Sequence, residues 1–173
     1  MQIHELLNDF RKSGKMTFYV DYFLQNPKKI NELVDVIVNE EKYPYPEYGS
    51  WILIHIQKAN PLFVEPFQNK LIDVILKSSN QSVLRNCCNI LQSISKTDYR
   101  EAELLDRIID FIKSNDNKVA LQVYSLYCLI PFVKAYPELK TELSSLVRLA
   151  VNERTPAYKV AVRKFLEWIK KID

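Results

Sequence analysis

The sequence predicts an all-α fold in which about ten helices form five antiparallel pairs and wind into a right-handed superhelix. Three observations lead to this prediction. A short apolar block recurs every 37–38 residues, and a second apolar segment of helical length follows each block. The chain of 173 residues contains only 2 glycines, where average usage of about 7% would give roughly 12. Because β-turns draw heavily on glycine, this scarcity disfavours a fold rich in strands.

The repeat is visible in the residues of the apolar blocks. They begin at steps of 38, 37 and 38 residues and occupy Leu33–Ile37, Leu71–Ile75, Ile108–Ile112 and Leu146–Ala150. A polar stretch separates each block from the apolar segment that follows it. Apolar residues recur in these segments at spacings of three and four, which is typical of helices. Each period is therefore one pair of helices.

The pairs are expected to form a single domain over 1–173. The predicted repeats are 27–60, 61–98, 99–136 and 137–173, and a shorter pair within 1–26 caps the first of them. Asn26, Asn60 and Thr155 each directly precede a proline and are predicted to cap helix N-termini. Pro66 and Pro131 fall inside helical patterns and predict kinks.

The length of the repeat and the positions of its prolines indicate a known class of solenoid. A helical pair of 37–38 residues has the length of HEAT and armadillo repeats. Pro61 and Pro66 break the first helix of the second repeat, and Val83 and Arg85 lie in its second helix, as in HEAT repeats. These features predict a HEAT/armadillo-like solenoid.

The chain also resembles a family of small bacterial armadillo-type proteins. The segments that carry this resemblance best are Val119–Tyr124, Tyr136–Lys140 and Tyr158–Leu166. The resemblance implies the solenoid fold. The family has no established activity, although some members are labelled adenylosuccinate lyase. This sequence has neither the length nor the glycine-bearing signature loop of that enzyme.

The second helix of each pair is expected to line the concave, ligand-accepting surface of such a solenoid. Steps of 37 residues, and one further helical turn, select six residues that would form a polar ladder there. They are Tyr48, Arg85, Gln122 and Lys159, with Asn89 and Arg163 one turn further on. We interpret this ladder as the binding surface of a protein or peptide scaffold, whose partner is unknown and could be acidic.

Residue types that support metal binding or catalysis are sparse. Structural zinc needs four Cys or His ligands, and adjacent Cys87 and Cys88 point about 100° apart on a helix. We expect both, with Cys128, to be small core residues, and His55 to be a partly buried histidine. The expected ladder carries few carboxylates for general acid–base work. The sequence therefore predicts a non-enzymatic protein without metal or cofactor, with an unrecognised concave-face enzyme as the third alternative.

Aspartates recur at equivalent places in the first helices. They are Asp35, Asp73 and Asp110, which the period places at the same position of successive repeats. Catalysis needs a unique group rather than one copied in each repeat. A solvated or capping role is therefore the expectation for all three.

Basic residues are concentrated at the C-terminus. From 148 to 173 the chain has seven basic and three acidic residues, an excess of +4, which leaves −1 for the rest of a chain whose net charge is +3. Lys159, Arg163 and Lys170 share one helix face. This stripe has three interpretations: a solvated cap, a site for an acidic protein, or a weak nucleic-acid site, which is the alternative function. Trp168 is expected to seal the last pair against Leu139, Leu143 and Leu146.

The compartment is expected to be the cytoplasm. No apolar run approaches the ~20 residues of a membrane span, and the N-terminal residues lack the pattern of a secretory signal. Three cysteines, two of them adjacent, suit reduced thiols better than a disulfide framework.

Overall fold

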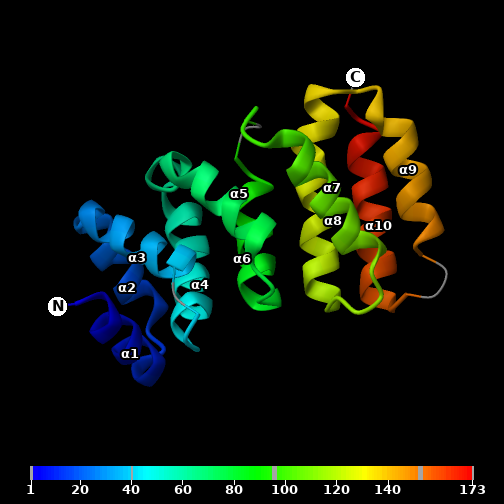
Figure 1. The fold of residues 1–173 in the computed structure, drawn as a ribbon. Coiled ribbons are helices and arrows are strands. Elements are labelled where there is room, and N and C mark those ends of the chain that lie inside the picture. The colour runs from blue at the N-terminus through cyan, green and yellow to red at the C-terminus, as the bar shows by residue number, and fades with distance from the viewer. Residues whose placement is uncertain (1, 40, 95–96, 152–153, 173) are drawn as a thin grey trace.

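The protein folds into an array of α-helices, as the sequence predicts. A computed structural model describes residues 2–39, 41–94, 97–151 and 154–172, and this part of the chain contains ten α-helices, two short 3-10 helices and no strand. The α-helices are α1 (Ile3–Ser13), α2 (Met16–Gln25), α3 (Pro27–Asn39), α4 (Tyr45–Ala59), α5 (Gln68–Lys77), α6 (Gln81–Leu91), α7 (Glu101–Lys113), α8 (Val119–Ala135), α9 (Leu139–Leu149) and α10 (Pro156–Ile169). They form five consecutive pairs, and the termini lie at opposite ends of the array (Figure 1).

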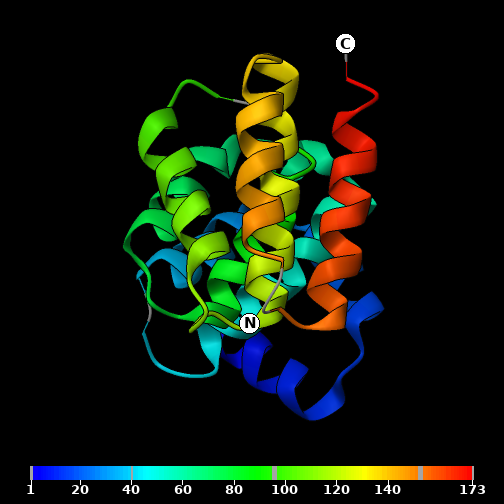
Figure 2. The ribbon, with the colours of Figure 1, turned by 90° about the vertical axis from the view of Figure 1, so that its right-hand side faces the viewer.

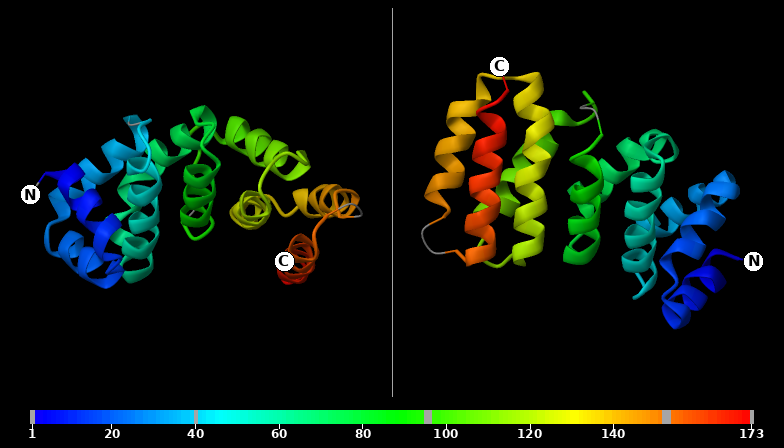
Figure 3. Two further views of the ribbon diagram at one scale, coloured as in Figure 1. Left: turned by 90° about the horizontal axis from the view of Figure 1, so that it is seen from below. Right: turned by 180° about the vertical axis from the view of Figure 1, so that it is seen from behind.

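The helices lie in two curved layers. The second helices of four pairs, α4, α6, α8 and α10, pack side by side and form the inner layer (Figure 3, left). The first helices α3, α5 and α7 contact one another in the outer layer, and α9 continues it at the C-terminal end. Figure 2 views the array from this end, with α9 and α10 in the foreground. The α1–α2 pair packs against α3 and α4 at the other end. The handedness of the superhelix stays a prediction.

Caps and prolines set several of the helix boundaries. The Asn60 side chain accepts from the Leu62 amide at 3.2 Å, and the Thr155 hydroxyl accepts from the Tyr158 amide at 3.4 Å, so both predicted caps are confirmed. Asn26 is different, because its side chain donates backwards to the Tyr22 carbonyl at 2.8 Å. Pro66 lies in the 3-10 helix η2 (Glu65–Phe67), which follows η1 (Pro61–Phe63) and delays the start of α5. In contrast, α8 continues through Pro131.

Polar pairs at the repeat spacing link neighbouring inner helices within an apolar core. Asn86 Nδ2 donates to Ser50 Oγ at 2.9 Å, and Gln57 Nε2 donates to Ser93 Oγ at 2.7 Å. Each pair is 36 residues apart, close to one repeat. Because Asn86, Ser50 and Gln57 are buried, these hydrogen bonds satisfy groups that would otherwise be costly to desolvate and fix the register of adjacent repeats.

The cysteines belong to this core. All three are buried free thiols, as expected for small core residues, and Cys128 Sγ donates to the Cys88 carbonyl at 3.0 Å. Burial raises the pKa of the Cys87 and Cys128 thiols above the ordinary value of 9.0. Such thiols stay protonated and unreactive at neutral pH.

The recurring aspartates lie on the outer helices, where two of them connect consecutive repeats. Lys70 Nζ lies 2.8 Å from the Asp35 carboxylate, and Arg100 Nη1 lies 2.7 Å from that of Asp73. Asp110 is exposed. These pairs are partly or largely solvated, so they contribute little to stability. No helix in the described part of the chain is long and apolar enough to cross a membrane.

Candidate functional site

A groove of about 370 Å³ crosses three helices of the inner layer, and we call it the inner groove. Its lining residues come from α4, α6 and α8, and within each helix consecutive lining residues are one, three or four positions apart. These residues are Trp51, Ile54, His55, Lys58, Arg85, Asn86, Asn89, Ala120 and Tyr124. The periodicity of each helix therefore places one side of it on a shared surface.

The inner groove combines cations with aromatic rings. Lys58 and Arg85 supply two positive charges, and none of the lining residues is a carboxylate. Neither cation forms an ion pair within the described ranges of the chain, so both charges are available to a ligand. The Trp51 side chain is 45% exposed and supplies an apolar surface beside them. This composition suits a ligand that carries both negative charge and an apolar side chain.

A chain of hydrogen bonds holds Arg85 in place. Arg85 donates from Nε at 3.1 Å and from Nη2 at 3.0 Å to Asn86 Oδ1. Asn86 donates in turn to Ser50 Oγ at 2.9 Å, and Ser50 donates to the Glu47 carbonyl at 3.1 Å. A guanidinium has five N–H donors, so the two of Nη1 and the second of Nη2 remain. These donors form the end-on edge that binds a carboxylate through two parallel hydrogen bonds.

His55 is a neutral member of the inner groove. Its ring centroid lies 6.3 Å from that of Trp51. Burial is the main cause that lowers its pKa below the ordinary value of 6.5, and the charge of Lys58 acts in the same direction. The imidazole is therefore uncharged at neutral pH and adds a hydrogen-bonding group rather than a third cation.

Aromatic rings extend the surface from the inner groove toward the C-terminus. The ring centroids of Tyr124 and Tyr127 are 6.3 Å apart, and those of Tyr127 and Trp168 are 5.6 Å apart. We call these three residues the aromatic row. They connect α8 with α10, so the inner groove and the aromatic row form one continuous surface on the inner layer.

The position of Trp168 corrects the expectation that it seals the last pair. Trp168 is 50% exposed, and its ring lies against Tyr127 of α8. It lies about 60–100° around the helix from the buried residues Phe165 and Ile169, at the edge of the apolar stripe. With Tyr158, these two residues fill the interface instead, and the indole lies at its border.

Two residues of the predicted ladder do not reach the inner groove. Gln122 is 2% exposed, and its amide donates to the Ser114 carbonyl at 2.7 Å, so it stabilises the loop between α7 and α8. Tyr48 is half-buried with its ring centroid 5.5 Å from that of Phe10 in α1. The exact 37-residue step does not account for how the N-terminal pair and the interhelical loops cover individual positions, so these two residues lie outside the inner groove.

Lys159 and Arg163 are exposed but lie on a different side of α10. They precede Trp168 by nine and five residues, which corresponds to rotations of about 180° and 140° around the helix. Trp168 marks the side that contacts α8, so both cations point away from the inner groove. Of the six predicted residues, the structure brings together only Arg85 and Asn89.

Sequence reasoning missed Trp51, Lys58 and Tyr124 as groove residues. A signal for two of them was present, because Trp51, His55 and Lys58 are spaced by four and three residues on α4. Polar and aromatic residues on one face of an apolar helix indicate an exposed strip. The apolar residues Ile52, Leu53, Ile54 and Ile56 lie between them in the sequence and obscure this strip.

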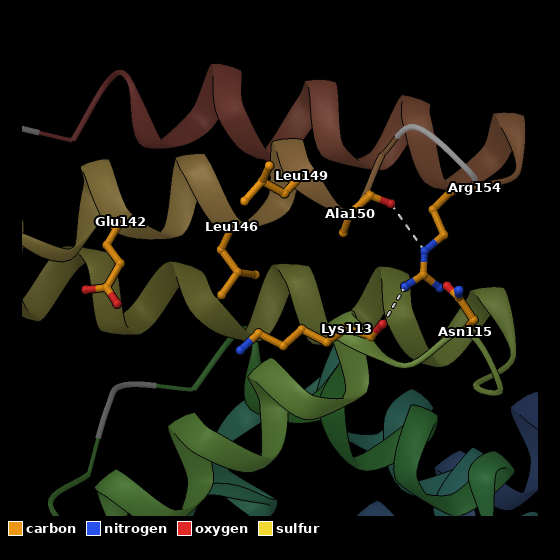
Figure 4. Close-up of a pocket in the computed structure, with 7 residues that line it drawn as sticks. All are labelled: Lys113, Asn115, Glu142, Leu146, Leu149, Ala150 and Arg154. Atoms are coloured by element: carbon orange, nitrogen blue, oxygen red, sulfur yellow. Dashed lines mark hydrogen bonds between the residues drawn. The ribbon is translucent and has the colours of Figure 1, made fainter.

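A second groove lies on the outer layer at the C-terminal end. It has a volume of about 720 Å³ and lies between the end of α7 and α9, with Leu146, Leu149 and Glu142 on one side and Lys113 on the other (Figure 4). Arg154 lies at its end and donates to the Lys113 carbonyl at 2.8 Å and to the Ala150 carbonyl at 3.2 Å. Because its guanidinium binds backbone carbonyls and the lining mixes both charges, this groove is a weaker candidate site.

Comparison with known proteins identifies the family. The profile of the HEAT repeat domain matches residues 3–169, which is nearly the whole chain. No curated protein and no solved structure matches the chain. The match agrees with the ten helices packed as pairs, and such domains commonly serve as protein-binding scaffolds. The chain therefore belongs to the HEAT repeat domain family.

Proposed function

We propose that this protein is a non-enzymatic scaffold that binds a protein or peptide partner on the inner layer. The observation that carries the proposal is the inner groove, where Lys58 and Arg85 lie beside Trp51 and Tyr124 without a carboxylate in the lining. Solenoids offer such extended concave surfaces to macromolecular ligands. The shallow and open form of this site suits a peptide chain better than an enclosed small molecule.

The chemistry of the inner groove supports binding rather than catalysis. His55 is its one group that titrates near neutral pH, and no carboxylate in the lining orients it or shares a proton with it. General acid–base and nucleophilic catalysis depend on such paired groups. The buried thiols are unsuited to nucleophilic catalysis because burial keeps them protonated.

Weak nucleic-acid binding is the second candidate function, and one observation favours it. Lys159, Arg163, Lys164, Lys170 and Lys171 are all exposed on or just after α10. These cations would contact phosphates without reading sequence. Arg154 is not part of this surface, because its guanidinium binds backbone carbonyls.

Two variants with the same change of charge separate these functions. In the first variant, Lys58→Glu and Arg85→Glu reverse the charge of the inner groove. In the second, Lys159→Glu and Arg163→Glu reverse the charge on the side of α10 that points away from the inner groove. Proteins captured from extract by the wild-type chain are compared with those captured by each variant, with and without nuclease. We expect capture to survive the α10 variant and nuclease, and to be lost with the inner-groove variant. The opposite pattern would reject the inner groove in favour of nucleic acid.

A further inference from the structure

We propose that the partner segment is an extended acidic peptide, which places an Asp or Glu carboxylate on Arg85 and a large apolar side chain against Trp168, about six residues away. This inference rests on the proposed function and names the chemistry of the partner. It follows from three features: the free edge of Arg85, the aromatic row, and the distance between them.

The free edge of Arg85 selects the acidic side chain. Asn86 occupies the side of the guanidinium that carries Nε, and its own bond to Ser50 keeps it there. The end-on edge of Nη1 and Nη2 is thus fixed before a ligand arrives, so a carboxylate that binds there loses little entropy to ordering. Lys58 adds positive charge to the same groove, and its lining offers no acidic competitor.

A carboxylate fits this groove better than a phosphate group. Proteins that recognise phosphorylated peptides use clusters of arginines to balance a charge near −2. Here the lining holds one arginine and one lysine, which match a single carboxylate with a second acidic residue nearby. We therefore assign the anionic group to Asp or Glu side chains.

The aromatic row selects the apolar side chain. Trp168 is half-exposed, and its ring is tilted by 41° to that of Tyr127. A partly exposed indole supported by a second ring offers apolar area in a rigid form, and such residues contribute a large share of the binding energy at interfaces. An aromatic or leucine side chain would remove this area from water.

The distance between the two features sets their spacing in the peptide. Ring contacts of 6.3 and 5.6 Å lead from Tyr124 to Trp168, a span of at most about 12 Å. Tyr124 lies on the helix next to that of Arg85, and adjacent helices are ~8–10 Å apart. An extended chain covers the resulting ~20 Å in about six residues at ~3.3 Å each.

Selection from random peptides tests this inference on the full chain. Twelve-residue peptides displayed on phage are selected against the wild-type protein, and the enriched sequences are synthesised. We expect enrichment of an acidic residue and an aromatic or leucine residue five to eight positions apart. The affinity of each peptide is measured by tryptophan fluorescence, since Trp51 and Trp168 are the only tryptophans in the sequence.

Variants on both sides of the contact test the assignment to Arg85. Arg85→Lys keeps the charge but loses the two-donor edge, so we expect affinity to fall at least tenfold, whereas Arg163→Lys on the far side of α10 changes it less than twofold. Replacing the peptide Glu by Gln should weaken binding to the wild type at least tenfold and to Arg85→Lys much less. Trp168→Ala should remove most of the preference for the apolar residue.

The outcomes separate this inference from the proposed function. Enriched peptides that lack the acidic residue, or whose Glu→Gln loss is the same with Arg85→Lys, would overturn the carboxylate assignment while leaving the scaffold function intact. A phosphoserine in place of Glu that binds more than tenfold tighter would overturn it as well. Failure to enrich any peptide overturns the short-segment partner. The proposed function fails separately, when protein capture does not depend on Lys58 and Arg85.

Discussion

Replacing Arg154 with alanine is expected to destabilise the C-terminal end of the array. Its guanidinium donates to the carbonyls of Ile112 at 3.0 Å, Lys113 at 2.8 Å and Ser114 at 3.1 Å, at the end of α7, and to that of Ala150 at 3.2 Å, at the end of α9. The last carbonyls of a helix have no partner within the helix, so this one side chain satisfies acceptors from two outer helices.

The size of the effect follows from these contacts. A hydrogen bond to a charged group contributes about 1.5–3 kcal/mol to stability. Arg154 is half-buried and its four bonds share one guanidinium, so we expect Arg154→Ala to lower the free energy of unfolding by about 2–4 kcal/mol. Arg154→Lys should recover only part of this loss, because a single ammonium cannot reach carbonyls at both helix ends.

Urea unfolding followed by circular dichroism measures this loss, and Arg148→Ala is the matched control. The Arg148 side chain is exposed on α9 and has no hydrogen-bond or ion-pair partner among the described residues, and its replacement by alanine removes the same charge as Arg154→Ala. Its replacement should change stability by less than about 0.5 kcal/mol. Hydrogen exchange of Arg154→Ala should show early loss of protection in α9 and α10, since repeats are stabilised mainly by their neighbours. Equal losses for Arg154→Ala and Arg148→Ala, or a uniform loss of protection, would refute the reasoning.

Three further predictions concern side chains of α10 and α4. Phe165→Ala should cost about 3–5 kcal/mol in urea unfolding, because the ring is fully buried, whereas half-exposed Trp168→Ala should cost less than about 2 kcal/mol; equal costs would contradict their different burial. Tyr158→Phe should leave stability unchanged or raise it by up to about 1 kcal/mol, because no described residue accepts from its buried hydroxyl, whose pKa burial raises to about 12; a clear loss would reveal a partner. NMR titration should give His55 a pKa below 6.5, whereas in the unfolded chain this side chain is protonated at higher pH, so the free energy of unfolding should fall as the pH drops below about 6.5. This pH dependence should be weaker in His55→Gln, and a measured pKa of His55 above 6.5 would contradict the prediction.

The fold could be predicted from the sequence because the same helical pattern recurs in each repeat. Four copies of an apolar block at 37–38 residues fix the helical pair, and local signals such as Asn60 and Thr155 mark where helices begin. Asn26 shows the limit of such signals, since the same residue type before proline forms its hydrogen bond with the preceding helix. Local chemistry thus predicts helices well and individual caps less well.

The candidate site could be predicted only in part. The repeat placed Arg85 and Asn89 on the inner layer, as the structure has them. It also selected Gln122, which turns toward a loop carbonyl, and Lys159, which faces away from the inner groove on α10. A repeat period places backbone positions, whereas the exposure of a side chain depends on its rotation around the helix and on the loops that cover it.

The half-exposed position of Trp168 could not be predicted from the sequence either. An apolar stripe predicts which side of a helix is buried, but not which residue marks the edge of the stripe. In the last pair this edge is decided by Tyr158, Phe165 and Ile169, which fill the interface and leave the indole at its border. Residues at the edge of an apolar stripe are therefore the ones that sequence patterns place least well.

Hydroxyl-radical footprinting tests most directly whether the inner layer is the binding surface. The wild-type chain is oxidised alone and in complex with the partner that it captures, and the modified residues are identified by mass spectrometry. Trp51, Tyr124 and Trp168 should become protected, whereas Phe18 and Tyr43, which are 56% and 69% exposed outside the inner groove, should react as before. Unchanged oxidation of Trp51 and Trp168 in the complex would contradict the account.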